Sequence, residues 1–250
     1  MLDPVTRRSL PDAVFERICG RIFEGQLAPG DRLPAERELA LQLGVNRNAL
    51  REALKRLEQL RLVAIHPGGS TRVLDFRRSS GLDLLAALLF SGSGVLRLEA
   101  ARSLVELRTA LGPDIAARAA ARGGPAATAE LAHALDTLRA LPMTDLVARQ
   151  RQSLELWRVL VVASDNLAYR LAFNTMEQAW STIQDLVAPA LGDELEDQRG
   201  YDKMVRAVQR GDAAGARRAA EHLVDRGEAG LLRIIALATP RSPHKKKEQP

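Results

Sequence analysis

The chain has 250 residues, enough for one large domain or two ordinary ones. Hydrophobic residues make up 46% and aromatic residues only 4%, and the abundance of Ala, Leu and Arg over β-branched residues favours a mainly helical protein with a sizeable core. No apolar run approaches the roughly 18 residues that a membrane helix needs, the first ten residues lack the apolar segment of a secretory signal, and Cys19, the only cysteine, excludes an internal disulfide. We therefore expect a cytoplasmic protein that has no membrane partner.

The formal net charge of +5 is spread unevenly along the chain. Residues 1–78 hold 14 Lys and Arg against 10 Asp and Glu, whereas residues 79–240 hold 18 against 20. A basic block on a slightly acidic body suggests that the N-terminal part meets an anionic polymer, although a solvated surface often carries the same excess. The tail at residues 239–250 is expected to be a disordered basic end rather than a binding arm.

Three helices are predicted before residue 62. The first lies within residues 10–26, where apolar residues recur at helical spacing (Val14, Phe15, Ile18 and Ile22). The stretch "APGDRLP" then breaks the chain, Pro34 suits the first turn of a second helix, and Gly44 provides its C-terminal stop. Asn46 is a good N-cap for a third helix that runs to about residue 60.

The rest of the chain predicts one hairpin followed only by helices. Residues 62–65 and 71–74 are β-prone runs on either side of a "PGGS" turn. The stretch "RRSSG" at 77–81 is typical of a linker, and "SGSG" at 91–94 of a second break. Helices are expected near residues 82–90, 96–122, 126–140, 143–164, 166–190, 193–210 and 212–237.

The third helix has two distinct faces. Its apolar residues fall on one side at about 100° per residue: Leu50, Ala53, Leu54 and Leu57. Asn48, Arg51 and Lys55 fall on another side, with Arg47 at the boundary. A sharp turn at Gly44 sets this helix at an angle to the second and projects its start outward, which is helix-turn-helix geometry suited to base edges and phosphates. The alternative is two surface helices that merely carry charged faces.

At this point the sequence resembles a known family. The stretch "GQLAPGDRLPAERELALQLGVNRNALREALKRLEQLRLVAIHPGGSTRV" is similar to the winged helix-turn-helix of GntR-type bacterial transcription regulators, especially the FadR or FCD group with helical effector domains. The similarity covers roughly residues 10–75. It implies a mainly α fold with a winged helix-turn-helix domain at 1–77, which carries a small β-hairpin wing, and a linker and linking helix at 78–95. An all-helical bundle for ligand binding and dimerisation follows at 96–238.

The resemblance also assigns DNA contacts by position. Arg37, Arg47 and Arg51 correspond to arginines that contact DNA in this family. The other residues that we expect at the DNA are the amides at the helix start, the lysine one turn after Arg51, and the glycines of the wing tip: Asn46, Asn48, Lys55, Gly68 and Gly69.

Periodicity alone singles out an arginine in the C-terminal half. Arg108 lies at the centre of an apolar stripe (Ala101, Leu104 and Val105), so either an anionic ligand or an internal carboxylate should pair with it. Trp157 and Tyr201 also lie on inward stripes, although aromatic residues there are more often core than ligand contacts.

The segments "LVELRTALGPDIAARAAARG", "VVASDN" and "AVQRGDAAGARRAAEHL" look like parts of the FCD effector domain. Many members of that group bind a divalent metal through one Asp and three His. The corresponding residues here are Ser153, Trp157, Tyr201 and His222, so the resemblance implies that the metal site is lost and that no cofactor is bound. The cavity would then accept a small organic acid or an acyl-type effector, with Arg108, Trp157, Tyr201 and His222 as its binding residues and Leu160 and Phe173 in its lining. A vestigial pocket is the alternative.

No enzyme motif accompanies these features, since the chain has no G-x-S-x-G elbow, phosphate-binding glycine loop, C-x-x-C pair or H-E-x-x-H helix. We therefore predict a sequence-specific transcription regulator, a repressor that binds a palindromic operator in double-stranded DNA as a homodimer and responds to an effector. The alternatives are a constitutive or architectural DNA-binding protein and an acyl-CoA-responsive regulator of fatty-acid metabolism.

Overall fold

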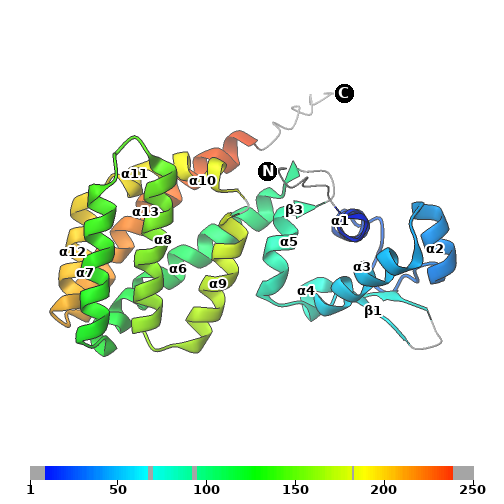
Figure 1. Cartoon of the computed structure of the whole chain (residues 1–250), viewed down its shortest axis with the longest axis horizontal. Helices are drawn as coiled ribbons and strands as arrows, with labels where there is room; N and C mark the ends of the chain where they lie inside the picture. The colour runs from blue at the N-terminus through cyan, green and yellow to red at the C-terminus, as the bar shows by residue number, and fades with distance from the viewer. Residues whose placement is uncertain (1–8, 67–69, 92–94, 182, 239–250) are drawn as a thin grey trace, which may run out of the picture. The chain divides into compact units, whose positions relative to one another are not determined.

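The computed structural model of the chain describes residues 9–66, 70–91, 95–181 and 183–238 (Figure 1). The chain divides into two compact units, Met1–Arg97 and Leu98–Pro250. Each unit buries its own set of apolar side chains. The prediction of a mainly helical fold with a small hairpin near the N-terminus is confirmed.

The N-terminal unit begins with the three predicted helices, α1 (Leu10–Phe23), α2 (Glu36–Leu43) and α3 (Arg47–Gln59). Gly44 ends α2 in the left-handed conformation, with φ of +66°, which glycine adopts without steric cost. Asn46 caps α3, since its Oδ1 accepts a hydrogen bond from the backbone N–H of Ala49 at 2.8 Å. The turn between α2 and α3 therefore forms from local signals in the sequence.

The core of this unit lies between α1 and α3. The apolar face of α3 is fully buried, with Leu50, Ala53 and Leu57 at 0% exposure. It packs against α1, where Cys19 is buried and burial raises the pKa of its thiol to about 12. Cys19 is therefore a neutral core side chain, as its place in an apolar pattern indicates.

The predicted hairpin is present as β1 (Val63–Ala64) and β2 (Arg72–Val73), two antiparallel strands in which Val63 pairs with Val73. A β-bridge between Arg32 and Arg72 ties β2 to the segment that precedes α2. Gly68 and Gly69, the predicted wing tip, lie outside the described residues.

Residues 76–97 contain more structure than the sequence suggested. The expected linker at 77–81 overlaps a short helix, α4 (Phe76–Ser79), which is followed by η1 (Leu82–Leu84) and α5 (Leu85–Leu89). At the expected break, β3 (Phe90–Ser91) pairs with β4 (Val95–Leu96) in a second antiparallel pair, and residues 92–94 lie outside the described residues. Strands of two residues have no detectable alternation, so the pattern could not reveal them.

The C-terminal unit is helical throughout its described residues. Its helices are α6 (Leu98–Arg122), α7 (Pro125–Ala140), α8 (Leu146–Ala163), α9 (Leu167–Ser181), α10 (Gln184–Ala190), α11 (Gly192–Leu195), α12 (Gln198–Gln209) and α13 (Ala213–Ala238). The helices predicted over 166–190 and 193–210 were each too long, because each is two helices. Asp197 begins α12 anew by accepting a hydrogen bond from the backbone N–H of Gly200 at 2.9 Å.

The longest helices, α6 and α13, pack along each other, and α12 packs against α13. In Figure 1, α7 and α8 lie side by side and α9 follows α8. Alanines without exposed surface, such as Ala116 and Ala119 of α6 and Ala216 and Ala220 of α13, let these helices approach closely. No helix in the described part of the chain is long and apolar enough to cross a membrane.

Candidate nucleic-acid interface and ligand cavity

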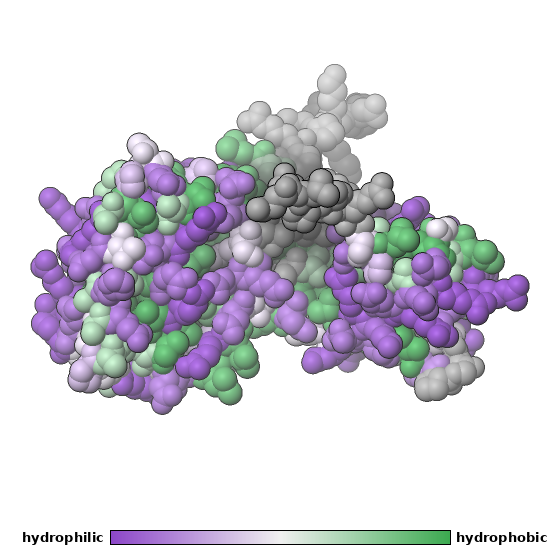
Figure 2. Space-filling view, viewed as in Figure 1, coloured by the Kyte–Doolittle hydropathy of each residue, from purple (hydrophilic) through white to green (hydrophobic). Residues whose placement is uncertain are grey.

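The polar face of α3 is open to solvent. Arg47, Asn48, Arg51 and Lys55 are all exposed, while the opposite face of the helix is buried. In Figure 2 the surface over α3 is mostly hydrophilic (purple). The buried face holds the helix in place, so the basic and amide side chains are presented outward by a rigid element.

Arg51 also contacts the neighbouring helix. Its Nε donates to Glu36 Oε2 at 2.7 Å across the α2–α3 turn, and both side chains are partly exposed, at 62% and 36%. An exposed pair of this kind contributes about 0–1 kcal/mol. Arg51 can therefore exchange Glu36 for a nucleic-acid acceptor at little cost. Arg37, one residue further along α2, is exposed and completes the set of predicted arginines.

Asn46 is predicted to contact DNA, and its side-chain oxygen Oδ1 also caps α3. The same side chain would therefore serve both roles. We expect Asn46→Ala to lower the free energy of unfolding by about 1 kcal/mol, the usual effect of losing an N-cap. Asn46→Ser, which keeps a capping oxygen, should retain most of that stability. Urea unfolding of the three proteins measures the difference, and equal stability of the alanine and serine variants would contradict the capping role.

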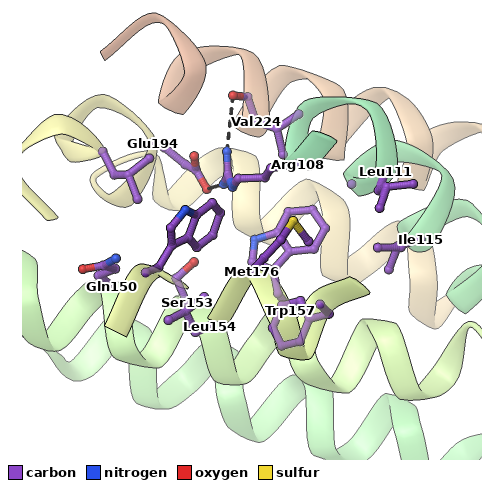
Figure 3. Close-up of a pocket in the computed structure, with 14 residues that line it drawn as sticks. Arg108, Leu111, Ile115, Gln150, Ser153, Leu154, Trp157, Met176, Glu194 and Val224 are labelled. Carbon is purple, nitrogen blue, oxygen red and sulfur yellow. Dashed lines mark hydrogen bonds and ion pairs between the residues drawn. The ribbon is translucent and has the colours of Figure 1, made fainter. Parts of the chain in front are cut away.

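An interior cavity lies in the C-terminal unit among α6, α8, α9 and α13 (Figure 3). Its volume is about 30 Å³. Aromatic and aliphatic side chains form most of its wall, among them Trp157, Phe173, Met176 and Trp180. The sequence-based expectation of an apolar cavity with Trp157 and Phe173 in its lining is met, whereas Leu160 is buried but does not line it.

Arg108 has an internal partner. Its Nη2 donates to Glu194 Oε1 in a buried ion pair, and its Nη1 donates to the carbonyl of Val224 at 3.5 Å. The guanidinium also lies 5.4 Å from the ring centre of Trp180. Of the two partners that the sequence left open for Arg108, the structure therefore supplies the carboxylate.

Two further helices contribute to this ion pair. Tyr201 of α12 donates from Oη to Glu194 Oε1 at 3.4 Å, and its Oη lies 2.8 Å from Ser153 Oγ on α8. Burial raises the pKa of Glu194, an effect that Arg108 opposes, and burial likewise raises the pKa of Tyr201. The four side chains form one hydrogen-bonded network, which we call the Arg108–Glu194–Tyr201–Ser153 network.

Several polar atoms around the cavity have no hydrogen-bond partner. Among the described residues, the buried side-chain atoms without one include both amide atoms of Gln150, Trp157 Nε1 and Glu194 Oε2, and all three residues line the cavity. Thr109 Oγ1 is the remaining one. Unpaired buried polar atoms are rare because each carries a desolvation cost of about 1–3 kcal/mol.

The four effector residues expected from sequence are not brought together. Arg108 and Trp157 line the cavity, Tyr201 lies behind Glu194, and His222 lies outside it, with a 59% exposed side chain whose Nε2 is 3.2 Å from Asp197 Oδ2. The expectation that His222 lines this cavity is therefore corrected. No group of three or more His, Cys, Asp or Glu suited to a metal occurs in the part of the chain that the structure describes.

Sequence reasoning missed two charged residues. Glu194 belongs to the four-residue α11, too short to show a periodic pattern. Arg149 of α8 is fully buried and donates four hydrogen bonds to three backbone carbonyls: Leu195 at 2.9 and 2.7 Å, Leu138 at 3.0 Å and Leu141 at 3.0 Å. The sequence offered one signal for Arg149, namely an arginine at a position where α8 faces the interior.

A helix-turn-helix with a hairpin, followed by a helical unit, defines a class of DNA-binding transcriptional regulator. The profile of the gntR family of bacterial regulatory proteins matches residues 10–73, and that of the FCD domain matches residues 103–226. The chain belongs to the GntR family and carries an FCD domain. Its family and relatives are regulators, which confirms that it is not an enzyme.

Individual relatives agree with this assignment. The HTH-type transcriptional regulator Mce2R of Mycobacterium tuberculosis is 38% identical over 242 residues, covering 96% of this chain and 99% of the relative. A protein called fatty acid metabolism regulator protein, from Serratia proteamaculans, is 33% identical over 174 residues, covering 67% and 68%. A solved structure of Lar, described as controlling the expression of the Listeria monocytogenes agr system, has a TM-score of 0.59 at 17% identity, covering 92% of this chain and 100% of Lar. At that identity it shows the fold alone.

Proposed function

We propose that this regulator is a repressor that binds a palindromic operator as a homodimer, with the start of α3 from each chain in the major groove. The observation that best supports this proposal is a set of exposed polar side chains on a helix whose opposite face is buried: Arg47, Asn48, Arg51 and Lys55. Arginine and asparagine read base edges there, and lysine contributes a phosphate contact. A dimer on two inverted half-sites follows from the two-fold symmetry that such operators share with their proteins.

We propose further that a small molecule in the cavity of the C-terminal unit modulates DNA affinity. Its unpaired polar atoms and apolar wall support this assignment. The name of the Serratia relative, a fatty acid metabolism regulator, favours a ligand with an apolar body. Such a ligand changes DNA affinity only if it binds the DNA-competent and DNA-free arrangements unequally.

The test of DNA reading uses a duplex that the wild-type protein selects from a random library. Arg47→Ala and Arg51→Ala should each weaken binding to it by roughly 1–3 kcal/mol, about 5- to 150-fold, while binding to a scrambled duplex changes much less. Fluorescence anisotropy at fixed salt measures both.

The charge-matched control is Arg218→Ala, which removes an exposed arginine from α13 in the other unit. It should leave specific binding within about twofold, because it alters only the long-range field. Sequence-specific binding retained by both α3 variants would refute the proposed contacts. Selected sites without inverted half-sites, or one chain per duplex, would refute the homodimer on a palindrome.

A further inference from the structure

The charges in the cavity cancel. Among the described residues that line it, the charged ones are Arg108 and Glu194, and they are paired with each other. Arginine stays protonated in proteins, so Glu194 serves as its counter-charge. A ligand carboxylate entering this site would be a second anion without a second cation, and a ligand ammonium would be a second cation. Either would bury a net charge, which is costly.

The buried polar groups without hydrogen-bond partners favour an uncharged, hydrogen-bonding ligand over a charged one. Gln150 offers an amide donor and an acceptor, and Trp157 Nε1 offers a donor. Gln150, Ser153 and Trp157 lie three and four residues apart on α8, so they follow one another along the helix face at the cavity. A group that both donates and accepts hydrogen bonds matches this set, whereas a carboxylate only accepts.

The polar groups also gather at one end. Figure 3 shows Glu194, Gln150 and Ser153 on one side of the view, where Leu154 also lies, and the aliphatic Leu111 and Ile115 on the other. A ligand that fills this space therefore needs one polar end and an apolar body. It must also displace side chains, since the free volume is about 30 Å³, and the unbranched Met176 is suited to move.

From these observations we infer that the cavity binds an uncharged molecule with an apolar body and a single hydrogen-bonding end of the amide type. This inference rests on the proposed function, in that it names the ligand class for the same cavity. It replaces the expectation from sequence that Arg108 would hold the acid group of an effector, because Glu194 already occupies that guanidinium.

Tryptophan fluorescence can report ligand binding at this cavity. Its only two tryptophans, Trp157 and Trp180, both line the cavity. Hexanamide, hexanoate and hexylamine have the same chain length, differ in charge at neutral pH, and do not absorb where tryptophan is excited. Titrating each into the full-length protein therefore reports occupancy through tryptophan emission, and thermal unfolding gives an independent measure.

For the wild-type protein, hexanamide should shift tryptophan emission and bind at least about tenfold tighter than hexanoate or hexylamine. Glu194→Gln, which keeps the size of the side chain but frees the charge of Arg108, should reverse the preference, so that hexanoate binds tighter than hexanamide. Glu196→Gln, an exposed change on the same segment, is the matched control and should leave the preference unaltered.

Gln150→Met tests the same ligand class and does not depend on Glu194→Gln being able to fold. This variant should bind hexanamide about tenfold more weakly because it lacks the polar end, yet unfold at a higher temperature without ligand because an unpaired buried amide is gone. Hexanoate binding the wild type as tightly as hexanamide, or no probe perturbing either tryptophan, would overturn the inference. Operator binding and its loss in Arg47→Ala need no ligand, so that result would leave the DNA-binding proposal standing.

Discussion

Glu194→Ala is expected to lower the free energy of unfolding of the C-terminal unit by about 3–5 kcal/mol. The substitution leaves the Arg108 guanidinium buried at 7% exposure without its counter-charge, and it removes the acceptor of Tyr201. Urea unfolding followed by tryptophan emission reads this unit directly, because Trp157 and Trp180 both belong to it.

Two further variants, a control and a double substitution, are compared with Glu194→Ala. Glu196→Ala removes an exposed carboxylate two residues away and should change stability by no more than about 0.5 kcal/mol. The double variant Arg108→Met, Glu194→Leu removes both charges and should recover much of the lost stability, since apolar residues of similar volume replace buried ion pairs well. Equal stability of Glu194→Ala and Glu196→Ala would mean that Arg108 does not depend on this partner.

Arg149→Ala is expected to cost about 3 kcal/mol or more, because it removes four hydrogen bonds from a charged donor and leaves buried carbonyls without partners. The carbonyls of Leu138 and Leu141 stand at the C-terminal end of α7, where the helix dipole favours a cation, and that of Leu195 ends α11. Arg149 thus joins α7, α8 and α11 through one side chain.

Arg149→Lys should recover only part of that stability, because a single ammonium cannot reproduce the planar fork that reaches three carbonyls. The exposed neighbour Arg151 is the control, and Arg151→Ala should have little effect. Thermal unfolding with the same tryptophan signal measures all three variants. If Arg149→Lys were as stable as the wild type, charge alone rather than the geometry of the guanidinium would explain the site.

The two units differ in how far they could be predicted. In the N-terminal unit the signals are local: Gly44 ends one helix, Asn46 caps the next, and the apolar face of α3 follows from spacing within thirteen residues. The exposed positions of Arg47 and Arg51 follow from that same spacing. These features can therefore be predicted from the sequence alone.

In the C-terminal unit the informative contacts join residues far apart in sequence. Arg108 and Glu194 are separated by 86 positions, and Ser153 and Tyr201 by 48. Periodicity indicated that Arg108 and Tyr201 face inward but could not choose their partners. The family resemblance placed His222 with them, but a match of positions along a helix does not say which neighbour covers that face.

Gly227 shows how closely that choice depends on packing. A Cβ at this position of α13 would overlap Glu194 Oε2, so the glycine leaves room for the carboxylate beside Arg108. The residues near Gly227 in the sequence do not indicate this close contact with Glu194. From the sequence alone, a glycine inside a long helix indicates only that the helix is less stable there. The reason lies on another helix.

The sequence by itself determined the family, the helix-turn-helix and the charged face of α3, because caps, turns and helical spacing act between residues a few positions apart. Only the tertiary structure decided that Arg108 is neutralised by Glu194 and that Tyr201 and Ser153 support Glu194. It also decided that the side-chain amide of Gln150 and Trp157 Nε1 find no hydrogen-bond partner among the described residues. Burial, ion pairing and hydrogen-bond satisfaction are properties of side chains that meet across helices, and the order of residues along one helix does not specify which helices meet.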